Sequence, residues 1–278
     1  MSESVLSTYI LFNGIFYKNE DKLFTADIFE NFLFKEKIRA NHNHLLFWKE
    51  QIEQINRQLK LFHIKKSSPT EKGGTELKRQ IERSLTKNKL FKNALVYVYF
   101  FRNGNDIEYM IKEEKIIFEK KSISENGLFL SMDSSNIKNI SILSSYETGS
   151  KTFWDYARID TISSLEPIIQ NQEGNILEVP GKNMFVVNGN NIYTPNIIQG
   201  AFRSPAFPLV KEICLELKMN FIEDKKITEN DLTNADEIFL VNHIKGIQWV
   251  KGLGDRRYFL NKTRQIARLF QEKIEKNL

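Results

Sequence analysis

The chain has 278 residues, enough for one large domain or two medium-sized domains with their own hydrophobic cores. Hydrophobic residues make up 41% and charged residues 27%, as in ordinary globular proteins, and no apolar run reaches membrane-spanning length. The N-terminus has no basic region followed by an apolar stretch, so we expect a cytoplasmic protein that does not bind membranes.

A net charge of +5 and an isoelectric point near 9.0 raise the question of nucleic-acid binding. The lysines are spread among nearly as many acids, and no basic stripe is interleaved with aromatic residues. We therefore expect no nucleic-acid partner. The single cysteine, Cys214, excludes an intrachain disulfide and falls within a helical pattern, which favours a buried apolar role.

The N-terminal part of the chain predicts an α+β domain, because apolar residues alternate in some segments and recur at helical spacing in others. In chain order we expect a strand at 29–35, a helix at 45–61, a loop at 66–74, a helix through Leu77, Ile81 and Leu85, and a hairpin of 94–102 and 107–111 around Asn103-Gly104-Asn105.

A charged segment that ends at Asn126-Gly127 predicts a connection between two domains. Beyond it we expect a helix at 152–164, a strand at 167–170, a hairpin of 183–187 and 191–193 around Asn188-Gly189, a helix at 204–218, and strands at 239–242 and 246–250. The predicted layout is an N-terminal domain at 1–115, a connection at 116–130 and a C-terminal domain at 131–278. Clefts between two such domains commonly hold cofactors.

The segment 173–203, EGNILEVPGKNMFVVNGNNIYTPNIIQGAFR, is the most informative part of the chain. Glu178 is followed, after four residues, by Asn183 and an apolar pair, and then by a Thr-Pro and a Gly-Ala-Phe-Arg. This arrangement resembles the class IV (fold type IV) pyridoxal-phosphate enzymes, which include branched-chain and D-amino-acid aminotransferases and aminodeoxychorismate lyases. The resemblance implies an α+β protein of the D-amino-acid aminotransferase type, with an N-terminal α+β domain and a C-terminal α/β-barrel-like cofactor-binding domain. It also implies a homodimer.

Pyridoxal phosphate needs a lysine for a Schiff base, an acid opposite the ring nitrogen, and an anion site for its phosphate. By resemblance, Lys151 is the Schiff-base lysine and the general acid/base, Glu178 is the acid, and Asn183 belongs to the cofactor site. The interval from Lys151 to Glu178 is about five residues shorter than is usual in the family, a difference that a loop can absorb.

The expected phosphate site departs most from the family pattern. The family's His and Arg on the helix at 45–61 are Gln51 and Gln54 here, and we expect Arg57, one turn further, to substitute. The family's phosphate-binding Gly-Ile-Thr turn is Gly200-Ala201-Phe202, whose amides remain. His243 aligns with a third phosphate contact, although a hydrogen-bonded histidine at a strand end is an equal alternative.

For the substrate, the resemblance implies a small amino acid or aminodeoxychorismate, with Arg102 near its carboxylate and Asn242 as a second substrate-binding residue, of the kind found in the lyase branch. The turn at 24–30, FTADIFE, lacks both glycines of the corresponding family turn. We expect no metal, because the His42/His44 pair has no carboxylate or cysteine partner.

Two functions follow from these observations. The first is a pyridoxal-phosphate-dependent aminotransferase or aminodeoxychorismate lyase. The alternative is a divergent, non-catalytic relative that binds an anion or a partner protein, which the substitutions at 25, 27, 51, 54 and 202 favour.

Overall fold

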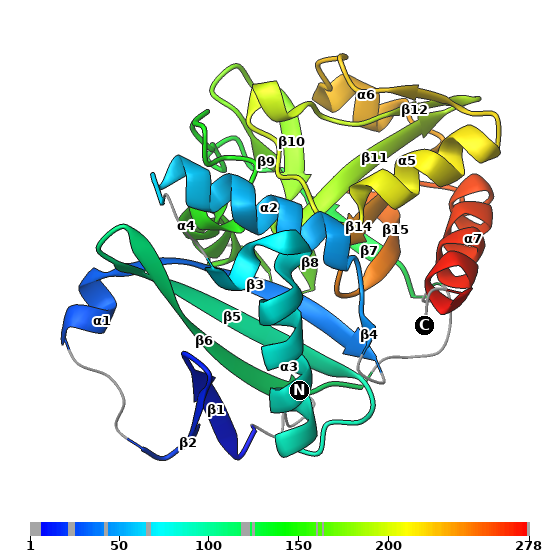
Figure 1. Cartoon of the computed structure of the whole chain (residues 1–278). Helices are drawn as coiled ribbons and strands as arrows, with labels where there is room; N and C mark the ends of the chain where they lie inside the picture. The colour runs from blue at the N-terminus through cyan, green and yellow to red at the C-terminus, as the bar shows by residue number, and fades with distance from the viewer. Residues whose placement is uncertain are drawn as a thin grey trace. The chain divides into compact units, whose positions relative to one another are not determined.

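The computed structural model of the chain is shown in Figure 1. It divides into two compact units, Met1–Glu119 and Lys120–Asn277, and the division falls inside the predicted connection. The structure describes residues 7–21, 26–41, 44–64, 68–117, 123, 126–159, 161–162 and 164–276.

Unit 1 is built on an antiparallel sheet of six strands in the order β2-β1-β6-β5-β3-β4. Its strands are β1 (Tyr9–Phe12), β2 (Ile15–Lys18), β3 (Phe32–Asn41), β4 (His44–Leu45), β5 (Ala94–Asn103) and β6 (Asp106–Lys115). The predicted hairpin of β5 and β6 is confirmed, with Asn103 opposite Asp106. β1 and β2 were not predicted.

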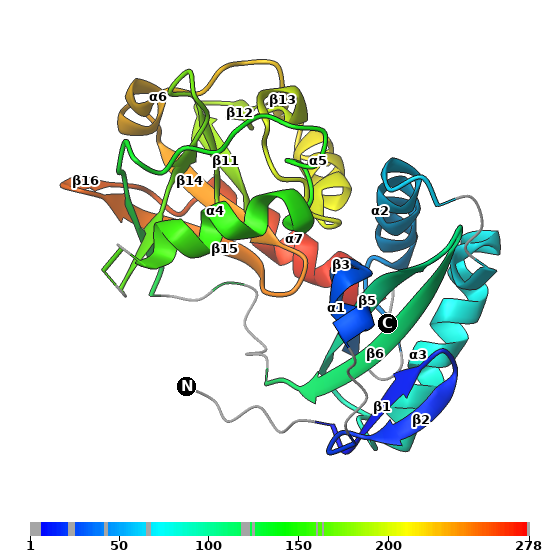
Figure 2. The same cartoon turned by 90° about the vertical axis from the view of Figure 1, so that its left-hand side faces the viewer.

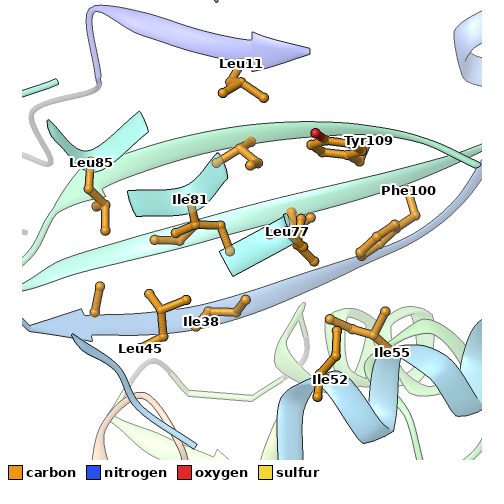
Figure 3. Close-up of a cluster of buried hydrophobic side chains, with 14 of the residues drawn as sticks. Leu11, Ile38, Leu45, Ile52, Ile55, Leu77, Ile81, Leu85, Phe100 and Tyr109 are labelled. Atoms are coloured by element: carbon orange, nitrogen blue, oxygen red, sulfur yellow. The ribbon is translucent and has the colours of Figure 1, made fainter. Parts of the chain in front are cut away.

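The helices of unit 1 are α1 (Ala26–Glu30), α2 (Trp48–Leu61), η1 (Ser68–Thr70), η2 (Lys72–Gly74) and α3 (Thr75–Lys87). Figure 3 shows Ile52 and Ile55 of α2, and Leu77 and Ile81 of α3, in one apolar cluster with the side chains of the sheet. The strand predicted at 29–35 begins only at Phe32, because the residues before it form α1.

Unit 2 contains a ten-stranded sheet. Its strands are β7 (Leu128–Ser131), β8 (Leu165–Pro167), β9 (Ile169–Gln170), β10 (Ile176–Val179), β11 (Lys182–Asn188), β12 (Asn191–Tyr193), β13 (Asn220–Ile222), β14 (Glu237–Asn242), β15 (Gly246–Leu253) and β16 (Arg256–Arg257). The consecutive strands β8 and β9 pair with β7 and β10, respectively. Since β7 and β10 are also linked through β15, β14 and β11, the sheet closes into the expected barrel-like form.

The helices of unit 2 are α4 (Glu147–Ile159), η3 (Ile197–Gln199), α5 (Phe207–Glu216), α6 (Glu229–Thr233) and α7 (Lys262–Lys276). α5 and α7 pack together, and α7 lies beside β14 and β15 (Figure 1), whereas α4 (Figure 2) contacts β8. α7 was not predicted. Among the described residues, no helix is long and apolar enough to cross a membrane.

Two features hold unit 2 together near its centre. The rings of Phe185 and Phe239 stack at 4.8 Å, and Phe207 of α5 stacks on Phe185 at 5.5 Å. The buried carboxylate of Glu237 in β14 accepts hydrogen bonds from the backbone amides of residues 261, 262 and 263, at distances of 2.8 to 3.1 Å. A carboxylate is favourable there because the start of a helix carries a partial positive charge.

Candidate functional site

Glu178 is the centre of the candidate site. It lies in β10, in which every residue is buried, and it faces Asn183 of β11 across the turn at Gly181. Gly181 has φ = 72°, a left-handed conformation that glycine adopts without strain. The short hairpin therefore fixes the Glu178–Asn183 pair that the sequence spacing singled out.

Three donors converge on the Glu178 carboxylate. Oε1 accepts from the Nζ of Lys138 at 2.7 Å and from the indole Nε1 of Trp154 at 2.6 Å. Oε2 accepts from the backbone amide of Phe202. The Trp154 ring also packs edge-to-face on Phe202, with centroids 5.0 Å apart. The carboxylate is thus fully buried and held by side chains and backbone of unit 2 alone.

Lys138 was not predicted as a functional residue. Its side chain has no exposed surface, and Nζ donates to Glu178, to the carbonyl oxygen of Ser144 and to Oγ of Ser150, the last two at 3.1 Å. All three N–H groups of the ammonium therefore have acceptors. Burial lowers the pKa of Lys138, and the charge of Glu178 acts in the opposite direction.

The backbone of Lys138 is anchored as well. Its amide donates to the carbonyl oxygen of Gln170 at 2.8 Å, beside a parallel bridge between Ile137 and Gln170. The segment between β7 and α4 contains no helix or strand, so the sequence offers no periodicity from which the direction of Lys138 could be inferred.

Lys151 lies on a different face of α4. The helix begins at Glu147 rather than at 152, and this start directs Ser150 toward Lys138 and Trp154 toward Glu178. Lys151 has a side chain that is 50% exposed, and it pairs with Asp155 one turn further along the helix. Its role as the Schiff-base lysine stays a prediction.

The amides expected to bind phosphate donate within the protein. The amide of Ala201 donates to the carbonyl oxygen of Asn196 at 3.4 Å, and that of Phe202 donates to Glu178. Gly200 ends η3 with φ = 96°. Asn183 holds the same segment, because its Nδ2 donates to the carbonyl oxygen of Phe202 and its Oδ1 accepts from the amide of Ser204.

His243 and Asn242 lie beside this segment at the end of β14. Nδ1 of the buried His243 is 3.3 Å from Oγ of Ser204, and the backbone amide of His243 donates to the same hydroxyl at 3.2 Å. Asn242 donates to the carbonyl oxygen of Gly181 and accepts from the amide of Ile244. Both residues therefore brace the loops around Glu178.

The remaining predicted residues belong to unit 1. Arg57 is exposed on α2, whereas Gln51 is buried and donates to the carbonyl oxygen of Lys37 at 2.8 Å. Arg102 donates to the carbonyl oxygen of Phe62 at 2.6 Å. The first two residues of the turn at 24–30, and His42, lie outside the described residues.

The described residues contain no group of three or more His, Cys, Asp and Glu side chains that could hold a metal ion. The direct contact between Lys138 and Glu178 does not fit these two residues as the Schiff-base lysine and the acid of a pyridoxal-phosphate site. The pyridine ring separates its nitrogen from the carbon that a lysine attacks, so the acid and the Schiff-base lysine must lie on opposite sides of the ring. Here Glu178 and Lys138 are in direct contact and leave no space for a ring between them.

Comparisons with known proteins identify the family. The family model for amino-transferase class IV matches residues 33–253. A probable branched-chain-amino-acid aminotransferase of Aquifex aeolicus is 27% identical over 112 residues, a match that covers 38% of this chain and 34% of that protein.

Solved structures show the same fold. The branched-chain aminotransferase of Thermoproteus uzoniensis, solved with norvaline, has a TM-score of 0.82 at 19% identity, covering 98% of this chain and 96% of that one. The Escherichia coli branched-chain amino acid aminotransferase has a TM-score of 0.79 at 18% identity, covering 95% and 93%. The chain therefore belongs to the class IV aminotransferase family and has the fold type IV architecture.

Proposed function

We propose that this chain is a non-catalytic member of its family, which acts without pyridoxal phosphate as a partner protein. The direct ion pair between Lys138 and Glu178 carries this proposal. The acid that would keep a cofactor ring protonated already has an ammonium group as its partner, and neither side chain has any exposed surface.

Two further observations support the proposal. Gln51 and Gln54 stand where the family has a histidine and an arginine, and losing a charge-assisted hydrogen bond to phosphate weakens binding by roughly 1.5–3 kcal/mol. The amides of Ala201 and Phe202 already donate within the protein. A phosphate at this segment would therefore have to displace existing hydrogen bonds.

The rival function is a pyridoxal-phosphate-dependent aminotransferase or aminodeoxychorismate lyase that acts on a small amino-carboxylate through Lys151. The family match over 33–253 and the spacing of Glu178 and Asn183 favour it. It requires Lys151 to leave Asp155 and to turn from the exposed face of α4, and it requires Lys138 to withdraw from Glu178.

The partner role is supported by an apolar surface on unit 1. A cavity of about 370 Å³ opens on the face of the sheet opposite α2 and α3, with Ile10, Phe101 and Met110 in its wall. At its rim Phe29 and Phe32 are 70% and 45% exposed. Large exposed aromatic side chains commonly mark protein interfaces, and we propose a homodimer as the simplest assembly that would cover them.

The test is to mix the purified protein with pyridoxal phosphate, reduce it with borohydride and locate any labelled lysine by peptide mass spectrometry. We expect no protein-bound Schiff-base absorption band and no stoichiometric label. A single label at Lys151 that disappears in Lys151→Ala would establish the rival function, and a single label at Lys138 would establish it with a different lysine. Scattered substoichiometric labels on exposed lysines are the expected background.

The partner role is tested separately. Light scattering should give the mass of a dimer for the wild type, and Phe29→Lys with Phe32→Lys should weaken or abolish that dimer. Monomeric wild type at all concentrations, with no protein captured from its own source, would contradict the proposal.

A further inference from the structure

We infer that Glu178 and its neighbours form a site for one small primary ammonium group, and that Lys138 is the built-in occupant of this site. A free alkylammonium ion should then be able to replace the side chain when Lys138 is shortened. This inference rests on the proposed function, since a site that takes an ammonium group beside Glu178 is not available to a cofactor ring.

The carboxylate of Glu178 does not depend on Lys138 for its orientation. Trp154, on α4, holds Oε1 at 2.6 Å, and the backbone amide of Phe202 holds Oε2. These two donors come from separate segments of the chain, and both remain when Lys138 is shortened. The carboxylate should therefore keep pointing at the place that the ammonium group now occupies.

The other two acceptors of the site are also fixed by contacts of their own. Ser150 donates its hydroxyl hydrogen to the carbonyl oxygen of Ser144 at 2.8 Å, so its lone pairs are available for Nζ of Lys138. The hydroxyl of Ser144 donates to the carbonyl oxygen of Asn139 at 3.0 Å. Three acceptors thus converge on one point, at distances of 2.7, 3.1 and 3.1 Å, which matches the three donors of a primary ammonium.

Charge makes the site selective for a cation. Removing one partner of a buried ion pair leaves an uncompensated charge, which is strongly unfavourable. In Lys138→Ala the carboxylate must either take up a proton or gain a new cation. A cation that fits should therefore bind at a pH at which carboxylates are normally ionised.

The atoms that Lys138→Ala removes determine which small molecule should fill the space they leave. Alanine keeps the Cβ of Lys138, so the deleted atoms are three carbons and the ammonium nitrogen. Propylammonium reproduces these atoms one for one. Propan-1-ol has nearly the same shape without the charge, and it serves as the neutral control.

The experiment is thermal unfolding of Lys138→Ala at neutral pH with each probe. At propylammonium concentrations several-fold above its Kd we expect Tm to rise by about 2–4 °C. Propan-1-ol should give no such rise, and neither probe should stabilise the wild type. An equal effect of both probes would overturn the inference, because the space would then be only an apolar cavity.

Two control variants separate a specific site from general effects of the salt. In the double variant Lys138→Ala with Glu178→Gln, the rise in Tm with propylammonium should disappear, because the neutral amide of glutamine needs no counter-ion. Lys182→Ala is a matched truncation of another buried lysine, whose partner Glu166 is 25% exposed, and it should gain no stability from propylammonium. A rise that survives Glu178→Gln would contradict the proposed site.

If Lys138→Ala does not fold, its soluble yield during refolding provides the same test. Propylammonium should restore the yield and propan-1-ol should not; equal yields with both probes would overturn the inference. None of these measurements uses pyridoxal phosphate. A single stoichiometric label at Lys151 or Lys138 in the borohydride experiment would therefore refute the proposed function independently of the outcome here.

Discussion

Glu178 and Glu113 are two fully buried carboxylates, one in each unit, and their surroundings differ in one decisive respect. Glu178 faces the ammonium group of Lys138. Glu113 in β6 receives a hydrogen bond from Nδ2 of Asn88 at 2.9 Å, and no charge contributes to its pKa, which burial raises to about 7. Burial therefore favours the neutral form of Glu113, whereas Lys138 supplies a counter-charge for Glu178.

The largest change in stability is expected when Glu178 loses the ammonium group of Lys138. Lys138→Ala should lower the free energy of unfolding by about 3–5 kcal/mol, because the carboxylate is left buried without a counter-charge. Urea unfolding at neutral pH measures this loss. Lys138→Met combined with Glu178→Gln should recover part of this loss, because no unpaired charge remains buried, although the single side-chain oxygen of glutamine can accept from only one of the two donors, Trp154 or the amide of Phe202. A loss below about 1 kcal/mol in Lys138→Ala would show that the pair is unimportant for stability.

A substitution of Trp154 measures how much an uncharged hydrogen-bond donor to Glu178 contributes to stability. Trp154→Phe keeps an aromatic ring against Phe202 but removes the indole N–H that Glu178 accepts. Since hydrogen bonds to charged groups contribute roughly 1.5–3 kcal/mol, we expect a loss in that range by urea unfolding. A variant as stable as the wild type would mean that the indole contact contributes nothing.

Glu113 should differ from Glu178 in its effect on how stability depends on pH. Burial raises the pKa of Glu113 from 4.5 to about 7 in the folded protein, so the folded state binds this proton more tightly than the unfolded chain and stability falls as the pH rises between these values. Glu113→Gln removes this fall and should raise the free energy of unfolding by about 1–3 kcal/mol at pH 8 relative to the wild type. At pH 4 the two proteins should be equally stable. If the free energies of unfolding of the wild type and Glu113→Gln differed by the same amount at every pH, Glu113 would keep its charge in the folded state.

Lys151 gives the smallest expected effect. Its pair with Asp155 is half exposed, and exposed pairs one turn apart on a helix contribute about 0.3–0.5 kcal/mol. Lys151→Ala should therefore be nearly as stable as the wild type, and its spectrum with pyridoxal phosphate should be unchanged. Loss of a Schiff-base band that the wild type displays would support the rival function.

The sequence predicted the elements that are determined by residues close together in the chain. The hairpin around Asn188-Gly189 is confirmed: Asn188 faces Asn191, and Gly189, the first of the two residues between them, has φ = 53°, a left-handed value that glycine adopts without strain. The spacing of Glu178 and Asn183 likewise located a hairpin pair. Both depend on residues close together in the chain.

The Lys138–Glu178 pair could not be predicted in this way. The two residues are 40 positions apart, and Lys138 lies in an irregular segment that takes its direction from the bridge to Gln170. The predicted start of α4 was also late by one and a half turns of helix, and this error left the faces of Ser150 and Lys151 undetermined. Sequence patterns indicate which residue types are present, but the closure of the barrel decides which of them meet.

That closure also affects how the protein behaves toward other chains. An open sheet ends in strands whose unpaired N–H and C=O groups can recruit a strand from another molecule. In unit 2 the short strands β8 and β9 cover the free sides of β7 and β10. Two strands that would otherwise be open templates for strand addition are thereby paired within the chain. Six residues, 165–170, thus protect the barrel from aggregation through these two strands.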